Sequence, residues 1–535
     1  MNLLNDPFLT VRYRNGDQQR IVLADIVDPD IVDFAFPRAD FTGAAYQFVI
    51  SVLQTAFAPE TLDDWEELYS EPPKKDELQQ AFNKIQHAFN LSGDGPLFMQ
   101  DFEPLLDVKK PSPVSGLLIE APGGNTLKLN TDHFIKRGGC DHLSLPMAAM
   151  ALFTLQVNAP SGGQGHRTGI RGGGPLTTLL MPNDKEASLW QKIWLNVLSR
   201  EEWGYDEPDF YSEQVFPWLG ATRQSKNKGT EVYASDVHPL HLYWAMPRRI
   251  RLLVDEQPET CALTGELNSA SVSKYLTQNY GYNYSGSWWH PLTHYRTNPK
   301  KTNEENLSTK GQPGGISYKQ WQPLTLMDQE NGSHPAMVVQ AYTQERFDYL
   351  AGAEGFTPRL WAFGYDMDNM KARGWYSAEL PLFHCPKALR EQLLTHVKQI
   401  QNIALEVVWH CRTQIKAAWF EKPADAKGDM SYIDQMFFQQ TETAFYQLIQ
   451  ASISHSTSTE FIVPAKEAQK WLSCLRQTAL DLFDELVLSG IENGEGKNMK
   501  RIAKKRKELS GWLYAGKTVK SFEKEYLSRD KETAS

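Results

Sequence analysis

The sequence lacks long hydrophobic runs, and this absence argues against a membrane-spanning helix. No apolar stretch of the 535-residue chain reaches the roughly 20 residues that a membrane-spanning helix needs. The opening residues, MNLLNDPFLTVRYRNG, also lack the basic start and apolar core of a secretion signal. We therefore expect a cytoplasmic protein with no membrane partner.

Cysteine is scarce as well. The five cysteines are far apart and form no C-x-x-C pair, which is the usual spacing of structural zinc ligands. Scattered cysteines in odd number fit a reducing cytoplasm. We expect neither a metal nor any other cofactor. The cysteines are Cys140, Cys261, Cys385, Cys411 and Cys474.

An excess of positive charge is also missing. The formal net charge is −10 at pH 7, so the protein is not coated uniformly with basic residues. Nucleic-acid binding stays compatible with this balance, because local basic patches matter more than the total. Hydrophobic residues make up 41% of the chain, which is enough for substantial cores. The length predicts two or more domains.

The most unusual segment is SGGQGHRTGIRGGGPLTT, residues 161–178, in which seven of eighteen residues are glycine. It is not a Walker loop, because Pro175 and Leu176 stand where Lys and Ser or Thr must follow the last glycine. It is not a dinucleotide fingerprint either, since Thr168 replaces the third glycine. The segment is either a loop whose backbone approaches a ligand closely or a surface turn.

Local patterns predict an α+β fold. The strand-like segments PFLTVRY and QRIVLADIV flank Asn15-Gly16, which is a strong hairpin signal. Apolar periodicity predicts helices at residues 42–58 and at AAMALFTLQVNA, and GPLTTLLM after the glycine-rich segment is typical of a strand. We expect a mixed α/β N-terminal domain over residues 1–380.

The character of the sequence changes beyond Pro386. Four amphipathic segments with short connections predict a four-helix bundle over residues 381–535. They lie near residues 389–415, 431–453, 465–489 and 497–526.

The C-terminal segment is locally basic. From residue 497 onward, twelve Lys or Arg stand against five Asp or Glu. A basic helix suits contact with a nucleic-acid backbone, and a solvated last helix is the alternative. The candidates for backbone contact are Lys504, Lys505 and Arg506 in this helix, and Arg167 and Arg171 in the glycine-rich segment.

Paired carboxylates leave a second class of function open. Asp63-Asp64 is one such pair, and Asp366 with Asp368 is another. A glycosidase uses two carboxylates and lines its cleft with Trp, and the chain has fifteen Trp. A Trp-rich hydrolase acting on a glycan is therefore the alternative to a nucleic-acid-binding protein.

Four segments, taken in order, resemble the CasA family, the large subunits of the type I-E CRISPR surveillance complex, Cascade. They are NLLNDPFLTVR, LFTLQVNAPSGGQGHRTGIRGGGPLTTLL, GSWWHPLTHY and GYDMDNMKARGW. The resemblance implies a non-catalytic protein that recognises the motif flanking the target (the PAM) in duplex DNA, starts strand separation and recruits the helicase–nuclease. The implied partners are CRISPR RNA (crRNA), double-stranded target DNA and the subunits CasB, CasC, CasD and CasE.

The resemblance also implies which residues contact DNA. The family's glycine loop, which approaches the PAM duplex from the minor groove, falls on Ser161, Gly162, Gly163, Gln164 and Gly165. Its wedge loop, which inserts beside the first unpaired base pair, falls on residues 366–371 and includes Asp368, Asn369, Met370 and Lys371. A family lysine before GSWWHP has no counterpart here, and Lys274 is the nearest substitute.

Two further features of the family have weaker counterparts. The loop over residues 115–139 matches the element that docks on the crRNA 5′ handle and on neighbouring subunits, with Leu129, Asn130 and Thr131 at the contact position. Some members have a cysteine cluster capable of binding zinc near the position of Cys261. Only Cys261 is present here, so the resemblance adds no metal.

Overall fold

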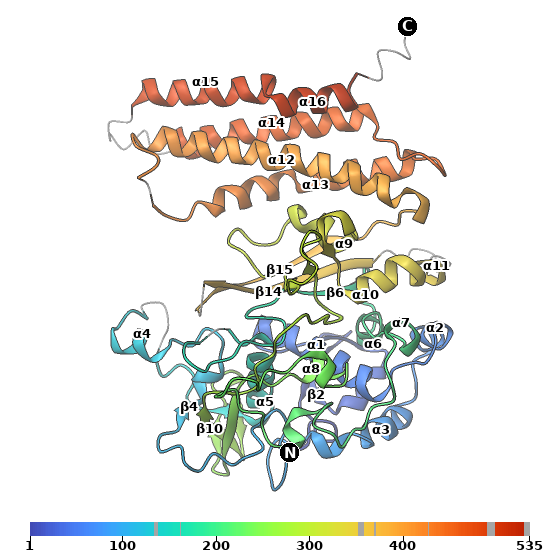
Figure 1. Cartoon of the computed structure of the whole chain (residues 1–535), viewed down its shortest axis with the longest axis vertical. Coiled ribbons are helices and arrows are strands. Elements are labelled where there is room, and N and C mark those ends of the chain that lie inside the picture. Colours follow the sequence, from blue (N-terminus) through green and yellow to red (C-terminus); the bar gives the residue numbers. More distant parts are fainter. Residues whose placement is uncertain are drawn as a thin grey trace. The chain divides into compact units, whose positions relative to one another are not determined.

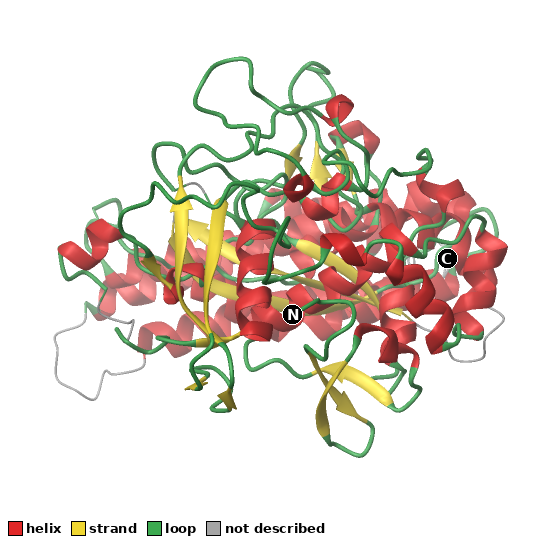
Figure 2. Ribbon diagram, turned by 90° about the horizontal axis from the view of Figure 1, so that it is seen from below, coloured by secondary structure: helices red, strands yellow, loops and turns green. Residues whose placement is uncertain are grey.

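The computed structural model describes residues 1–132, 137–160, 162–350, 358–368, 371–425, 427–488 and 498–528. The chain forms two compact units, whose elements are labelled in Figure 1. The first unit comprises Met1–Gly311 and Gln329–Glu379, and the second comprises Gln312–Asp328 and Leu380–Ser535. Helices and strands both contribute to the architecture (Figure 2), which confirms the predicted α+β class.

The N-terminus forms the predicted hairpin. Strand β1 (Leu9–Tyr13) pairs antiparallel with β2 (Gln18–Ile21), and β3 (Ile31–Phe34) pairs with the other edge of β1. Gly16 in the turn has φ = +93°. Glycine adopts this left-handed conformation without a Cβ clash, so the Asn-Gly signal marks the turn as expected.

Helix α1 (Ala39–Ala56) lies at the centre of the first unit's core. Fifteen of its eighteen residues are buried, so the helix is enclosed on nearly all sides. Helix α5 (Leu145–Asn158) packs beside it. Phe48 of α1 meets five other aromatic rings at steep angles, which accounts for part of the high aromatic content. These rings belong to Phe8, Phe89, Phe98, Phe153 and Trp244.

One sheet of the first unit is built around strand β10 (Ser271–Gln278). This strand pairs antiparallel with β7 (Arg249–Asp255) over most of its length. The two-residue strands β4 (Ser112–Pro113) and β5 (Leu143–Ser144) pair with other parts of it. β10 ends one residue before Asn279, which supports the glycine-rich loop described below.

A second sheet has the strand order β15-β14-β6. Strand β6 (Thr177–Pro182), predicted directly after the glycine-rich segment, is buried throughout and pairs antiparallel with β14 (Pro358–Asp368). Strand β15 (Lys371–Pro381) follows β14 after two residues. β14 and β15 therefore form a long hairpin, whose tip carries the predicted wedge loop.

The remaining elements of the first unit are short, and several helices begin at a side-chain cap, such as Thr61 or Ser199. The helices are α2 (Leu62–Ser70), α3 (Lys75–Asn83), α4 (Gly124–Lys128), α6 (Leu189–Trp194), α7 (Arg200–Trp203), α8 (His241–Trp244), α10 (Met337–Ala341) and α11 (Phe347–Leu350), and the strands are β8 (Glu259–Thr260), β9 (Leu267–Asn268), β11 (Tyr295–Arg296), β12 (Leu307–Ser308) and β13 (Ser333–His334).

Long helices form most of the second unit. The first three predicted helices are present, and the fourth is divided at Gly516, whose extended backbone (φ −60°, ψ 146°) interrupts the helix. Phe445, Trp471 and Leu482 are among the fully buried residues between the helices. The helices are α12 (Arg390–Trp419), α13 (Ser431–His455), α14 (Ala465–Leu488), α15 (Met499–Ala515) and α16 (Lys517–Tyr526).

The segment Gln312–Asp328, which carries helix α9 (Trp321–Thr325), belongs to the second unit, although the sequence interpretation included it in the first domain. The ring of Tyr318 stacks on Phe445 with centroids 4.5 Å apart, and its hydroxyl lies 2.8 Å from Thr441 Oγ1. These partners are more than a hundred residues away in the sequence, so no local pattern predicts the contact.

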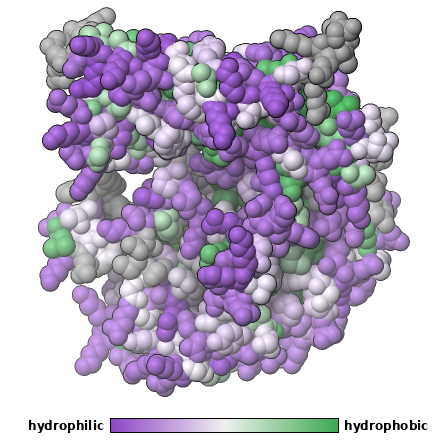
Figure 3. Space-filling view, turned by 45° about the horizontal axis from the view of Figure 1, so that its top comes forward, coloured by the Kyte–Doolittle hydropathy of each residue, from purple (hydrophilic) through white to green (hydrophobic). Residues whose placement is uncertain are grey.

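The face of the molecule seen in Figure 3 is mainly polar. Hydrophilic residues cover most of the face seen in Figure 3, and hydrophobic residues show between them in small groups. Among the described residues, no helix combines the length and apolar character that crossing a membrane requires.

Candidate nucleic-acid interface

The glycine-rich segment starts with an exposed tip that contains two left-handed glycines. Gly163 has φ = +92°, and a Cβ atom built on it meets no other atom within 4 Å. Gly165 has φ = +76°, and a Cβ atom there would lie only 2.8 Å from Asn279 Cβ. Glycine is therefore required at residue 165 by close packing, whereas residue 163 faces open space. Ser161 lies outside the described residues.

Asn279 and Tyr280, which directly follow β10, hold this tip in place. Asn279 Nδ2 donates to the carbonyl oxygen of Gln164 at 2.9 Å. The backbone N–H of Tyr280 donates to the carbonyl oxygen of Gly165 at 2.8 Å. The tip is thus a supported loop, and the side chain of Gln164 is exposed on it.

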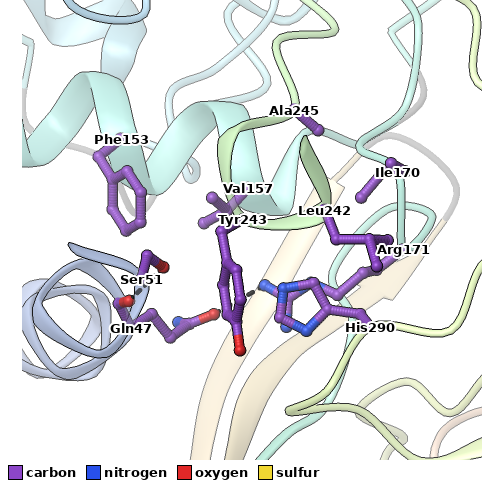
Figure 4. A pocket seen from close by; sticks show the side chains of 10 residues that line it. All are labelled: Gln47, Ser51, Phe153, Val157, Ile170, Arg171, Leu242, Tyr243, Ala245 and His290. Atoms are coloured by element: carbon purple, nitrogen blue, oxygen red, sulfur yellow. Dashed lines mark hydrogen bonds between the residues drawn. The ribbon is translucent and has the colours of Figure 1, made fainter. Parts of the chain in front are cut away.

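The two arginines of the segment are engaged within the protein. Arg167 donates to both the hydroxyl and the carbonyl oxygen of Ser225 at 2.8 Å. Arg171 is buried and donates to Gln47 Oε1 at 2.7 Å (Figure 4) and to the hydroxyls of Thr177 and Thr293 at 3.0 and 3.1 Å. Burial lowers the pKa of Arg171 to about 10. Arg171 braces the segment from inside, so we leave it out of the DNA contacts.

The far end of the same segment packs on the wedge hairpin. A Cβ atom on Gly174 would lie 2.5 Å from Met367 Cγ of β14. A Cβ atom on Gly364, also in β14, would lie 2.7 Å from the carbonyl oxygen of Pro175. One continuous segment therefore contacts the support of the glycine tip at one end and the base of the hairpin tip at the other.

The hairpin tip is acidic on one strand and basic on the other. Asp366 is buried and accepts a hydrogen bond of 2.7 Å from Arg373 Nη2. Asp368 is exposed, with a carboxylate oxygen 3.9 Å from Arg373 Nη1. Lys371 is exposed at the start of β15. Asn369 and Met370, the other two residues predicted for the wedge, lie outside the described residues.

Lys274 is exposed near the middle of β10, five residues before Asn279. Five residues of extended strand span about 16 Å. Lys274 therefore faces solvent on the strand that supports the glycine tip, and it does not itself touch the tip.

The predicted crRNA-docking residues follow helix α4. Leu129 is 69% exposed, which is high for a leucine. Asn130 has φ = +53° and its side chain accepts a hydrogen bond of 3.0 Å from Arg137. The N–H of Thr131 bonds to the carbonyl oxygen of Thr126 at 3.0 Å. This turn presents an apolar side chain to solvent on a backbone that local hydrogen bonds support.

The three basic candidates of α15 differ in availability. Lys505 pairs with Glu508 and Arg506 pairs with Asp484, each at 2.7 Å. Lys504 is exposed and has no ion pair within the described part of the chain. Lys500 and Lys507, which are not among the predicted contacts, are also exposed and have no ion pair within the described residues. Their spacing of four and three residues puts all three lysines on one face of the helix, and this periodicity is visible in the sequence.

The acidic pairs that favoured a hydrolase have structural partners. Asp64 accepts hydrogen bonds from the N–H and hydroxyl of Thr61 and caps helix α2. These bonds to Thr61 lower the pKa of Asp64. Asp366 is paired with Arg373 as described above. Within the described ranges, no three His, Cys, Asp or Glu side chains gather in a group that could hold a metal ion.

Comparison with known proteins identifies the relatives of this chain. A family model described as CRISPR-associated protein Cse1 matches residues 2–482. The fold is similar to CasA (Cse1) of Thermus thermophilus, with 15% identity, TM-score 0.65, and 96% of this chain and 99% of that chain covered. Cse1 of Thermobifida fusca matches with 17% identity, TM-score 0.65, and coverage of 96% and 97%. A chain of a CRISPR RNA-guided surveillance complex matches with 15% identity, TM-score 0.65, and coverage of 96% and 99%.

Proposed function

The chain belongs to the Cse1 family of CRISPR-associated proteins, and from this membership we propose that it is the non-catalytic large subunit of a type I-E CRISPR RNA-guided complex in the cytoplasm. In this role it recognises the PAM in duplex DNA, wedges the strands apart to start R-loop formation, and recruits the helicase–nuclease. Guide RNA pairing reads the target sequence, while the protein reads the flanking motif, as in other RNA-guided systems.

The observation that carries the proposal is the course of the glycine-rich segment. Its tip at residues 162–165 is exposed and supported by Asn279, and its far end packs on β14 through Gly174. A motif reader and a strand separator must act at a fixed separation along one duplex. A single braced segment that contacts both elements meets this requirement.

The tip suits the minor groove of DNA. The groove is only about 6 Å wide, and Gly163 presents backbone without a side chain. Readout there distinguishes mainly A·T from G·C pairs. Gln164 adds an exposed amide that can donate to or accept from a base edge. We therefore propose a motif reader of low stringency whose preference is adjusted by Gln164.

The hairpin tip is the proposed wedge. Asp368, Asn369, Met370 and Lys371 occupy it, and an apolar side chain such as Met370 is the type that unstacks base steps. Lys274 is proposed to contact the DNA at the PAM, and Lys504 is proposed to contact the DNA backbone. Leu129, Asn130 and Thr131 are proposed to dock on the crRNA handle and on the neighbouring subunits CasB, CasC, CasD and CasE.

The variant Gly163→Leu tests this function in the complex assembled with its guide RNA. A leucine at the tip blocks entry to the minor groove, so we expect a loss of at least about tenfold in affinity for motif-bearing duplex in a gel shift. The matched control is Gly16→Leu in the β1–β2 turn. Gly16 has φ = +93° and equally open surroundings, so it carries the same backbone strain.

Equal binding by both variants would refute the assignment of the glycine tip. Hydrolysis of a glycan by the isolated chain, dependent on an acidic pair, would overturn the whole proposal in favour of a hydrolase. A chain that copurifies with neither a guide RNA nor other subunits would contradict membership of a complex.

A further inference from the structure

A pocket of about 310 Å³ lies beside the β14–β15 hairpin. It falls within the range of ligand-sized pockets, whose lower end is roughly 300 Å³. Its wall includes Trp375 and Gly374 of β15 and Tyr365 of β14, and its rim includes Arg38, Glu120 and Arg373. These residues all belong to the first unit. We call this site the hairpin pocket.

We propose that the hairpin pocket holds an unpaired nucleobase of the opened DNA. This inference rests on the proposed function, because it needs the hairpin tip to separate the strands. It adds a binding site for the product of that separation, a single unpaired base, next to the element that creates it.

The aromatic wall of the pocket fits a planar ring. Trp375 is half-buried and contacts Tyr365 in a T-shaped arrangement with centroids 4.8 Å apart, and Phe363 in a tilted one at 5.4 Å. The indole is thus held by two other rings while part of it stays accessible. Proteins that bind unpaired bases stack them on aromatic side chains held in this way.

The charges of the pocket favour an uncharged ligand over a phosphate. Arg38 pairs with Glu120 at 2.7 Å and with Asp40 at 2.8 Å, and Arg373 pairs with Asp366 at 2.7 Å. Both guanidinium groups are therefore paired with carboxylates, Arg38 with two that line the pocket and Arg373 with the buried Asp366 outside its lining. These ion pairs still offer N–H donors and carboxylate acceptors. They match the edge of a nucleobase, which carries both hydrogen-bond acceptors and donors.

The position of the pocket relative to the tip fits the first unpaired nucleotides. Trp375 is four residues after Lys371, so it lies about 13 Å along the strand from the tip. Duplex DNA rises about 3.4 Å per base pair. The pocket is therefore within reach of the first few positions that open, on either the target strand or the displaced strand.

The test uses permanganate, which oxidises unstacked thymines, on the assembled complex bound to motif-bearing DNA. Two DNA targets are used. One carries thymines at the first three unpaired positions of the target strand, and the other carries them at the same positions of the displaced strand. With the wild-type chain, we expect one thymine to be protected about tenfold relative to its neighbours. The strand that shows this protection identifies the source of the base.

Two variants remove the pocket in different ways. Trp375→Leu deletes the stacking wall, and Ala39→Leu adds bulk at an exposed lining residue in the first turn of α1. Both are expected to abolish the protection. The matched control is Trp361→Leu, which removes another tryptophan of the same hairpin outside the pocket, and should retain the protection.

The inference is overturned if no thymine is protected with the wild-type chain, or if protection survives both pocket variants. A target whose strands are already separated beside the motif distinguishes the two proposals. If Gly163→Leu binds closed duplex normally, the proposed function fails. If Gly163→Leu weakens duplex binding while the pocket variants leave protection unchanged on the pre-opened target, only the hairpin pocket fails.

Discussion

Gly174 lies against Met367 so closely that a Cβ atom on residue 174 would come within 2.5 Å of the Met367 Cγ atom. Residue 174 also has φ = +61°. Both facts restrict this position to glycine, and together they fix the glycine-rich segment to the base of the β14–β15 hairpin. The connection between the proposed motif reader and the proposed wedge therefore depends on the absence of a single methyl group.

The variant Gly174→Ala is expected to lower the free energy of unfolding by about 2–4 kcal/mol. About 1–2 kcal/mol comes from the left-handed backbone, and the rest from overpacking against Met367. The measurement is denaturant unfolding of the purified chain. Gly16→Ala is the control, because it has a left-handed backbone with no atom within 4 Å and should lose only the first part. Equal losses in the two variants would show that the contact with Met367 is dispensable.

The variant Asn279→Ala is expected to weaken binding of motif-bearing duplex about fivefold without a large change in stability. It removes the hydrogen bond to the Gln164 carbonyl, which is worth about 1 kcal/mol in ordering the tip. Affinity is measured by gel shift with the assembled complex. Asn268→Ala is the control, since it removes a similar exposed bond to the Glu266 carbonyl in the β8–β9 region. A drop in affinity with both variants would rule out a specific role for Asn279.

The variants Lys504→Gln and Lys505→Gln are expected to differ in the salt dependence of DNA binding. Lys504 has no intramolecular ion pair within the described residues, whereas Lys505 pairs with Glu508. Each lost phosphate contact lowers the slope of log K against log salt by about 0.9. We expect this decrease for Lys504→Gln and little change for Lys505→Gln, measured by titrating salt in a binding assay. Unchanged slopes in both would leave α15 as a solvated helix.

The stability of the first unit is expected to fall as the pH drops from 6.5 towards 4. Burial lowers the pKa of His241 to about 4 and of His294 to about 3, while an unfolded histidine titrates near 6.5. Both groups stay neutral in the folded state as the unfolded chain takes up protons. The contribution of each histidine is therefore complete above pH 6.5 and decreases by about 1.4 kcal/mol per pH unit below it.

Denaturant unfolding at several pH values checks this expectation with the variant His241→Gln. Glutamine can keep a polar contact near the Tyr284 hydroxyl, which lies 3.0 Å from His241 Nε2. The free energy of unfolding of the variant should decrease less steeply between pH 6.5 and 5 than that of the wild-type chain. Parallel declines would exclude His241 as a source of the pH dependence.

The local features of the fold could be predicted from the sequence, and the long-range ones could not. The hairpin at Asn15-Gly16 and helix α5 rest on patterns within about fifteen residues, and both are present. Arg171, in contrast, is buried because Gln47 and Thr293 meet it from positions 124 and 122 residues away. A basic residue in a glycine-rich loop has the same local pattern whether it faces solvent or the core.

The candidate site also combines features that local sequence predicts with features that depend on long-range packing. The glycine tip is exposed and supported by Asn279, a geometry open to both sequence interpretations, close approach to a ligand and a surface turn. The pairing of Arg506 with Asp484 depends on how two helices pack, and this packing decides which of the C-terminal basic residues remains available. The lysine periodicity at residues 500, 504 and 507 was readable in advance, because it depends only on the helical repeat.

The segment Gln312–Asp328 has a consequence for dividing the protein into fragments. The second unit is assembled from two stretches of chain, so cutting once near residue 380 does not release it whole. A fragment that starts at residue 380 lacks Tyr318. The side chains of Phe445 and Trp471, against which Tyr318 packs in the whole chain, then become exposed. Such a fragment exposes a hydrophobic cavity to water and is prone to aggregate. A fragment that contains the whole unit needs residues 312–328 joined to residue 380 through a short flexible linker.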